Sequence, residues 1–549
     1  MKIKFIQFWR SFQFSTLGDK FDALGRHKQK PGYLGIGAIA SNGECCAEIG
    51  GKILRNGGSA VDAAIATLLC EGVMLPHSLG IGGGFVANLY TKETGKIEIL
   101  IARETAPAAA HQDMFIAKEI TGAIAAATPG EIYGYWCLHQ KYGKLPWKTL
   151  FEPSIELCFK GHRVTKYLGN ILEFYRERVL KEATMAEIFI NPYTNDVYKE
   201  NEIMYRPQLG ETLKILAEEG PGAMYDGGRI GKMLVEDIQE MGGIITEEDL
   251  KNYKYTSVSY HFRVRWEEPI VMPFAKDYRL FTAPLPTSGV VLAFILNVME
   301  PLHTTDEPVF WQRMIEAFKH GYGFRTNLGD THYEPHVAEE FEKFLSPEFA
   351  DDIRTLIRDD TTCTNIGYYN ANFTHVEDHG TANLSVIAPN GDAIAITSTV
   401  NSHLGAKVRS RQTGIILNDE MDDFSTPGVV NTYGIPASPA NYIKPGKIPM
   451  SSTCPSITIL RYFILNEPIE AAINSGRVHH QLSPMYIDIE TTVPEYTIDY
   501  LLNVGHELNY LSPDKPFSAL TAIGFKTGKP HPVCDGRRLG STALINFNA

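Results

Sequence analysis

The sequence predicts an α/β fold because stretches typical of strands and stretches typical of helices both recur along the chain. Residues 381–400 hold two alternating apolar runs around an Asn-Gly pair, which favours the tight turn of a β-hairpin. Residues 125–320 are expected to be mainly helical and surface-forming, with apolar helices at 282–300 and 311–325. This mixture indicates an α/β fold, and the length alone would allow several domains.

Composition limits the classes of partner. The 549 residues are 44% hydrophobic and 21% charged, as in an ordinary globular protein. The net charge of −13 argues against nucleic acid or an anionic membrane surface as a partner and favours a small-molecule substrate. No apolar run reaches the ~18 to 20 residues of a membrane-spanning helix. The eight cysteines show neither Cys-x-x-Cys pairs nor metal-ligand spacing, so neither a metal site nor a cofactor is expected.

A helical hairpin is predicted near the N-terminus. One helix runs from Ser41 to a Gly-Gly turn, and a second begins at Ser59 with a Ser-x-x-Asp capping box. Cys46 and Cys70 lie almost equally far from the turn, which brings them together at the open end of the hairpin. A disulfide between them is therefore expected. Two buried free thiols are the alternative.

The segment that follows contains a glycine run and an arginine at the end of a strand. The run GIGGGF, residues 80–85, lacks the Gly-Lys-Ser/Thr of a phosphate-binding loop, so its glycines are expected to let the backbone pass close to another element or a ligand. The strand pair 85–91 and 96–107 delivers Arg103 at the end of an apolar run. An arginine there either pairs structurally or binds a carboxylate ligand.

The hairpin at residues 381–400 begins with a candidate nucleophile. With its turn at the Asn-Gly pair, Thr381 comes opposite Val400 within about one residue, beside Thr399 and Asn401. A threonine after Gly380 can serve as an N-terminal nucleophile once the peptide bond before it is cut, because its freed α-amine is the base that activates its own hydroxyl. The alternative is an ordinary β-branched strand residue.

The motifs around Thr381 carry a resemblance. TANLSV, TSTVN, GAKVRS, GIILNDEMDDF and KIPMSSTCPSI follow in order, and AVDAAIA, GIGGG and ARETAP precede them. Together they resemble the γ-glutamyltransferase family (γ-glutamyl transpeptidases, glutathione hydrolases) over about residues 33–549. The resemblance implies a four-layer αββα sandwich of the N-terminal-nucleophile hydrolase type.

The resemblance also implies an activity. A γ-glutamyl group would pass from glutathione or its conjugates to water, amino acids or peptides through an ester on Thr381. Self-cleavage between Gly380 and Thr381 would give a large chain, residues 33–380 after an N-terminal extension of residues 1–32, and a small chain, residues 381–549. The two chains would form a heterodimer.

The implied site is a clamp for the α-amino-acid end of the donor, with Thr399 positioning Thr381. Such a ligand requires a cationic group at one end and carboxylates at the other. The residues implied to bind its α-carboxylate are Arg103, Ser451 and Ser452. Those implied to bind its α-ammonium are Asn401, Glu420 and Asp423. For the acidic run 418–423, the alternatives are a solvated surface or a calcium loop, although EF-hand spacing is absent.

The chain departs from the family after residues 454–460, CPSITIL. There the family continues with a second strand and a loop of adjacent glycines that forms the oxyanion hole, whereas this chain lacks about two dozen residues and has no Gly-Gly pair after Thr381. Poor turnover is expected in consequence. The rival interpretations are another amidase of the same architecture, such as a cephalosporin acylase-like or asparaginase-like enzyme, and a catalytically impaired homologue or incomplete splice form that acts at most as a binding protein.

The location implied by the family is the extracellular face of the plasma membrane or the secreted fraction. Residues 1–30 contain a short aromatic run without a clear signal-peptide core.

Overall fold

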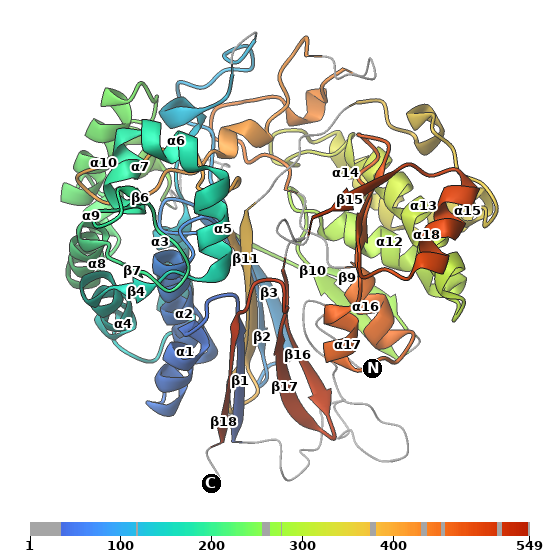
Figure 1. Ribbon diagram of the computed structural model, residues 1–549, viewed down its shortest axis with the longest axis horizontal. Helices are drawn as coiled ribbons and strands as arrows, with labels where there is room; N and C mark the ends of the chain where they lie inside the picture. Colours follow the sequence, from blue (N-terminus) through green and yellow to red (C-terminus); the bar gives the residue numbers. More distant parts are fainter. Residues whose placement is uncertain are drawn as a thin grey trace.

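A seven-stranded antiparallel sheet forms the centre of the protein (Figure 1). The computed structural model describes residues 35–116, 119–254, 264–275, 277–373, 380–429, 436–451, 456–512 and 519–546. In spatial order the strands are β18 (Ser541–Asn546), β1 (Ile36–Ser41), β11 (Thr381–Ile387), β12 (Ala393–Thr399), β2 (Gly84–Thr91), β3 (Lys96–Ala102) and β8 (Arg265–Glu267). The predicted α/β class is confirmed. The N-terminal extension 1–32 lies outside the described residues.

Helices cover one face of this sheet, at the left of Figure 1. They are α1 (Cys46–Arg55), α2 (Ala60–Met74), α3 (Glu131–Tyr142), α4 (Trp147–Lys160), α8 (Pro207–Glu219), α9 (Gly222–Tyr225), α10 (Arg229–Glu240) and α11 (Glu247–Asn252). The α2 cap forms as predicted, with Ser59 and Asp62 bonding each other's backbone N–H. Ser41, however, is the last residue of strand β1, so the prediction that a helix begins at Ser41 was wrong. Strand β1 is held by its pairing with β11 and β18, two strands that are distant in the sequence. No local sequence pattern reveals that pairing.

A second layer of strands lies against the other face of the sheet. Among the described residues it consists of two separate hairpins, β9 (Ile270–Phe274) with β10 (Tyr278–Thr282) and β16 (Thr521–Lys526) with β17 (Lys529–Cys534). Phe281 and Ile523 from these hairpins pack with Ala38, Ile97 and Ile387 of the main sheet. The expected four layers are therefore present, with the second sheet in two parts.

A second helical layer covers these hairpins, at the right of Figure 1. It contains α12 (Gly289–Leu302), α13 (Glu307–Arg325), α14 (Val337–Leu345), α15 (Pro347–Leu356), α16 (Ser456–Phe463), α17 (Ile469–Asn474) and α18 (Glu495–Val504). The small sheet β13 (Val478–His479), β14 (Ile487–Glu490) and β15 (Leu508–Leu511) joins it. Helices α12 and α13 exist as predicted, but both are buried almost throughout, so the expectation of a surface-forming segment was wrong for them.

A helical lobe, residues 162–204, completes the left side. It is built from α5 (Lys166–Phe174), α6 (Arg176–Lys181) and α7 (Ala183–Phe189) with the short strands β4 (His162–Arg163), β5 (Ile190–Asn191), β6 (Asp196–Val197) and β7 (Ile203–Met204). Leu168 and Phe189 of this lobe pack with Leu404 and Ile416 from the segment after β12. The lobe therefore lies next to the chain that follows the hairpin β11–β12.

The hairpin β11–β12 differs from the prediction by one residue of register. Thr381 pairs with Thr399 and not with Val400, because the loop is longer than a two-residue turn. Ala388 N–H donates to the Asp392 carbonyl, and within the loop only Gly391 has positive φ, +89°. A single residue with positive φ is typical of a three-residue hairpin loop. The longer loop moves the partner of Thr381 from Val400 to Thr399, which is within the predicted error of about one residue.

Candidate active site

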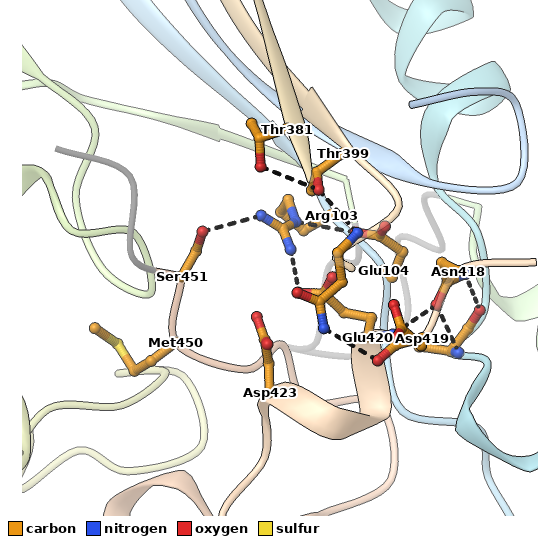
Figure 2. A network of polar contacts seen from close by, with 12 residues as sticks. Arg103, Glu104, Thr381, Thr399, Asn418, Asp419, Glu420, Asp423, Met450 and Ser451 are labelled. Carbon is orange, nitrogen blue, oxygen red and sulfur yellow. Dashed lines mark hydrogen bonds and ion pairs between the residues drawn. The ribbon is translucent and has the colours of Figure 1, made fainter. Parts of the chain in front are cut away.

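Two threonine hydroxyls lie close together at the open end of the hairpin β11–β12 (Figure 2). Thr381 begins β11 and is half-buried, and its Oγ1 donates to Thr399 Oγ1 at 3.3 Å. Thr399 Oγ1 donates to the carbonyl of Gly380 at 2.7 Å and accepts from Asn401 N–H at 2.8 Å. A hydroxyl has one proton to donate and two lone pairs. All three capacities of Thr399 are used, so its orientation between the nucleophile and the preceding carbonyl is fixed.

The backbone at this junction requires glycine. Gly380 has φ +114°, and a Cβ there would lie 2.7 Å from the Asn401 carbonyl oxygen and 2.8 Å from His403 N. Behind the hairpin, a Cβ on Gly83 would lie 2.1 Å from the Thr399 carbonyl oxygen. The glycine run at 80–85 thus lets the backbone pass close to β12, which is one of the two uses expected of it.

Arg103 is the centre of a buried ionic cluster below the threonine pair in Figure 2. Its Nε donates to Glu104 Oε2 at 2.9 Å, Nη1 donates to Ser451 Oγ at 3.2 Å, and Nη2 pairs with Glu420 Oε1. The side chain of Arg103 is only 5% exposed and both carboxylates are fully buried. Burial alone would lower the pKa of Arg103, but the carboxylates of Glu420 and Glu104 raise it, so the guanidinium stays charged.

The structure corrects one feature of the predicted clamp. A pocket with cation and carboxylates on opposite sides was expected, whereas Arg103 and Glu420 are paired directly with each other. The cation and one carboxylate of the predicted clamp are therefore paired with each other. Ser451 contacts Arg103 as expected of a carboxylate-binding group, and Ser452 lies outside the described residues.

The acidic run 418–423 is buried and well anchored, which excludes a solvated charged surface. Asn418 Nδ2 donates to the carbonyls of Gly82 and Ala127, and its Oδ1 accepts from the N–H groups of Ala127 and Glu420. The short helix η3 (Glu420–Asp423) follows, and its first and last carboxylates are buried on the Arg103 side. Asn418 thus fixes the segment that carries Glu420 and Asp423.

Asn401 follows β12 with φ +73°, a conformation that asparagine tolerates better than most residues. Its Nδ2 donates to the Asp419 carbonyl at 3.1 Å. Its Oδ1 is buried and accepts no hydrogen bond from any residue that the structure describes. A buried amide oxygen without a donor is well suited to an incoming ammonium group.

Two buried residues at the site were not predicted. Glu104 orients Arg103, and Arg538 donates from Nη1 to the carbonyl of Thr381. Glu104 is adjacent to Arg103 in the ARETAP motif, so that motif held the signal. Arg538 is 157 residues from Thr381, and its neighbour Arg537 is identical in type, so no local pattern marks it.

Behind β12, a glutamate is buried against the other face of the strand. Glu131, the first residue of α3, accepts through Oε1 from Ser398 Oγ at 2.8 Å and from the Tyr135 hydroxyl. Burial raises its pKa to about 8, although the hydrogen bonds from Tyr135 and Ser398 lower it. Burial thus favours the neutral form of the Glu131 carboxyl.

Comparison with known proteins identifies the family of the chain. A sequence model of the family described as Gamma-glutamyltranspeptidase matches residues 46–459 and 456–545. The chain belongs to the γ-glutamyltranspeptidase family.

Individual known proteins match more than nine-tenths of the chain. Scoloptoxin SSD14 of Scolopendra dehaani is 38% identical, over 96% of this chain and 94% of its own. Glutathione hydrolase 3 of Arabidopsis thaliana is 35% identical, over 93% and 87%. The crystal structure of cephalosporin acylase from Bacillus halodurans superposes with a TM-score of 0.78 at 21% identity, covering 97% of this chain and 99% of that one. That last likeness shows the fold alone.

The predicted disulfide is present. Cys46 of α1 and Cys70 of α2 are bonded, with Cα atoms 5.5 Å apart. The alternative of two buried free thiols was therefore wrong.

Among the described residues, no helix combines the length and apolar character needed to span a membrane.

Proposed function

We propose that this protein cleaves itself between Gly380 and Thr381 and then acts as a glutathione hydrolase and γ-glutamyltransferase. The observation that carries the proposal is the threonine pair beside a buried cluster of arginine, carboxylates and a serine hydroxyl (Figure 2). The substrates are glutathione and related γ-glutamyl compounds, with water, amino acids or dipeptides as acceptors. The family match and the glutathione hydrolase relatives support this assignment.

Self-cleavage follows from the hydrogen bonds at the junction. Thr381 Oγ1 attacks the Gly380 carbonyl carbon and passes its proton to Thr399, while Thr399 gives its own proton to the developing oxyanion on Gly380. The C–N bond then breaks, the nitrogen takes up the proton and an ester links Gly380 to Thr381. Water hydrolyses this ester, which leaves the Gly380 carboxylate and a free α-amine on Thr381. The two resulting chains stay together as a heterodimer.

Turnover uses the same hydroxyl. The α-amine of Thr381 takes the Oγ1 proton as Oγ1 attacks the γ-amide of the donor, and the leaving amine receives that proton when the γ-glutamyl ester forms. Water or an acceptor amine then attacks the ester and releases the γ-glutamyl group. Thr399 holds the hydroxyl in position throughout.

The clamp must open to admit the donor. An α-amino acid carries the charges that Arg103 and Glu420 present to each other, so its zwitterion can replace their ion pair by two new ones. Arg103 and the hydroxyls of Ser451 and Ser452 then hold the α-carboxylate. Glu420, Asp423 and the Oδ1 of Asn401 hold the α-ammonium. Recognition of both ends also disfavours an acylase whose substrates lack an α-amino acid.

The Cys46–Cys70 disulfide supports an oxidising location. We accordingly propose that the protein acts outside the cell, secreted or at the outer face of the plasma membrane.

A direct test begins with the purified chain. Denaturing electrophoresis should show two bands, with Thr381 as the first residue of the smaller one. A γ-glutamyl anilide should release its coloured amine, and the same compound acetylated on its α-amine should not. Thr381→Ala should stay whole and inactive. Thr397→Ala, which removes a hydroxyl of the paired strand β12 that donates to Asn383 Oδ1, should behave as wild type. A well-folded wild-type chain that stays whole, or that accepts the acetylated donor equally well, would refute the proposal.

A further inference from the structure

Strand β1 stops short of the nucleophile and leaves the edge of β11 uncovered there. Its last pair with β11 joins Ser41 to Leu384, so residues 381–383 have no strand beside them on that edge. Two side chains take the place of the strand. The Oδ1 of Asn42 accepts from Asn383 N–H at 2.7 Å, and Arg538 donates to the Thr381 carbonyl. Without Arg538 this carbonyl would lack its hydrogen bond at the first residue of the strand.

Arg538 is itself held firmly. It lies in the loop between β17 and β18 and is 4% exposed. Its Nη1 also donates to Ser78 Oγ at 3.3 Å, and Nη2 donates to the Tyr167 hydroxyl at 3.2 Å, with the guanidinium 4.7 Å from the centre of that ring. The Ser78 carbonyl in turn accepts from Val400 N–H, just after β12. Arg538 therefore links the start of β11 to Tyr167 of α5 and to Ser78, and Ser78 in turn bonds the residue after β12.

We propose that Arg538 is the positioning residue of the nucleophile, fixing the main chain of Thr381 so that its Oγ1 stays against Thr399 and its released amine keeps a defined place. The inference rests on the proposed function, because it concerns the same threonine. It gives the C-terminal loop a direct part in the reaction without contact to the donor.

The geometry also has an electrostatic consequence. The N–H and C=O of one strand residue point to the same edge, so the amine released from Thr381 faces the guanidinium. A nearby cation disfavours the ammonium form, which keeps the amine available as a base. Among the described residues, the titratable groups near Arg538 include Glu71, His77, Tyr167 and His403. Burial raises the pKa of the Glu71 carboxyl to about 7, although Arg538 lowers it. Burial, with Arg538 and His403, lowers the pKa of His77 well below its usual range, so His77 adds no charge.

A hollow next to Arg538 makes a chemical test feasible. It has a volume of about 460 Å³ and lies between α5 and the chain segments that follow β14, β15 and β17. Arg538 forms part of its wall, and Arg538 Nε is bonded to no described residue. A guanidinium ion added to the solvent can therefore reach the space that Arg538→Ala would leave.

The experiment compares Arg538→Ala, Arg538→Gln and Arg538→Lys with wild type in three measurements: the rate of self-cleavage, the kcat for a γ-glutamyl anilide, and the affinity for L-glutamate by calorimetry. Misplacement of a nucleophile by about 1 Å reduces rates on the order of 100-fold. We expect a loss of that size in the first two measurements for Arg538→Ala, with glutamate affinity within about threefold because the clamp is intact. Added guanidinium should raise the self-cleavage rate and the kcat of Arg538→Ala at least tenfold.

Two comparisons separate positioning from general damage. Arg206 is equally buried and donates to the carbonyls of Gly72 and Gly414 away from the nucleophile, so guanidinium should not raise the activity of Arg206→Ala. Arg538→Gln should move the acid limb of the kcat/KM profile to higher pH, whereas Arg538→Lys should keep it, because only lysine retains the cation. If Arg538→Ala fails to fold, these two variants decide the question.

The inference is wrong if folded Arg538→Ala cleaves itself and turns over within threefold of wild type, if glutamate affinity falls as much as kcat, or if the acid limb is the same in Arg538→Gln and wild type. A wild-type chain that cleaves itself but does not release γ-glutamyl groups would refute the proposed function instead. The effect of Arg538 on the cleavage rate would then still judge the inference.

Discussion

Replacing Arg103 by lysine tests the clamp without removing its charge. Arginine uses three separate nitrogens for Glu104, Ser451 and Glu420. The single nitrogen of lysine cannot occupy three such directions, so at least one hydrogen bond to a charged group is lost. Each such bond contributes about 1.5 to 3 kcal/mol. Arg103→Ala is less informative, because it leaves two buried carboxylates unpaired, which costs about 3 to 5 kcal/mol of folding free energy.

The expected effect of Arg103→Lys on binding follows from the same contacts. Loss of the bidentate contact to the donor carboxylate should weaken L-glutamate binding by about 10- to 100-fold, since 1.4 kcal/mol is a factor of ten. Calorimetry on a Thr381→Ala background measures this without turnover, and thermal unfolding of the same samples reports stability. Arg206→Lys is the matched control, because its guanidinium also lies buried but away from the site. A lower unfolding temperature with glutamate affinity within twofold of the parent would mean that Arg103 is structural only.

Three further predictions concern stability and processing. Because the folded state keeps the proton of Glu131 up to about pH 8 whereas the unfolded chain releases it near pH 4.5, stability should fall as pH rises between these values, and Glu131→Gln should flatten that slope in denaturant titrations. Gly380→Ala should block self-cleavage on electrophoresis while the chain stays folded, because its Cβ has no room and its positive φ disfavours alanine; normal cleavage would contradict the geometry of the junction. Replacing Cys46 and Cys70 together by alanine should lower the free energy of unfolding by about 3.5 kcal/mol, as expected for a loop of 24 residues, and an unchanged denaturation midpoint would refute this.

Local patterns in the sequence predicted the elements whose partners are close in the chain. The hairpin at 381–399, the capping box of α2 and the Cys46–Cys70 pair follow from turn residues and spacing alone. Strand β1 was missed because it pairs with residues more than 300 positions away. The one-residue error in register arose because Gly391 alone adopts positive φ, which the sequence Asn-Gly does not reveal.

The candidate site shows the same limit. The motifs brought Thr381, Thr399, Arg103 and Glu420 into one site, and the structure places them together. They could not show that Arg103 and Glu420 pair with each other, since that depends on how the two side chains meet in the folded chain. The expected loss of the oxyanion loop after residues 454–460 stays a prediction, because neither the structure nor the comparisons test it. Residues 452–455 lie outside the described part of the chain. The residues just after them form helix α16, where the family was expected to continue in strands.

The strand order of the main sheet determines what self-cleavage can accomplish. Strand β1 lies before the cut and β11 and β18 lie after it, yet β1 is hydrogen-bonded between those two strands. A cut at Gly380–Thr381 therefore produces two polypeptides that are threaded through each other's sheet, and neither can leave without unravelling a ladder on both sides of β1. The proposed cut therefore releases no fragment from an assembled sheet. For the same reason, the two chains synthesised separately should not meet as preformed halves.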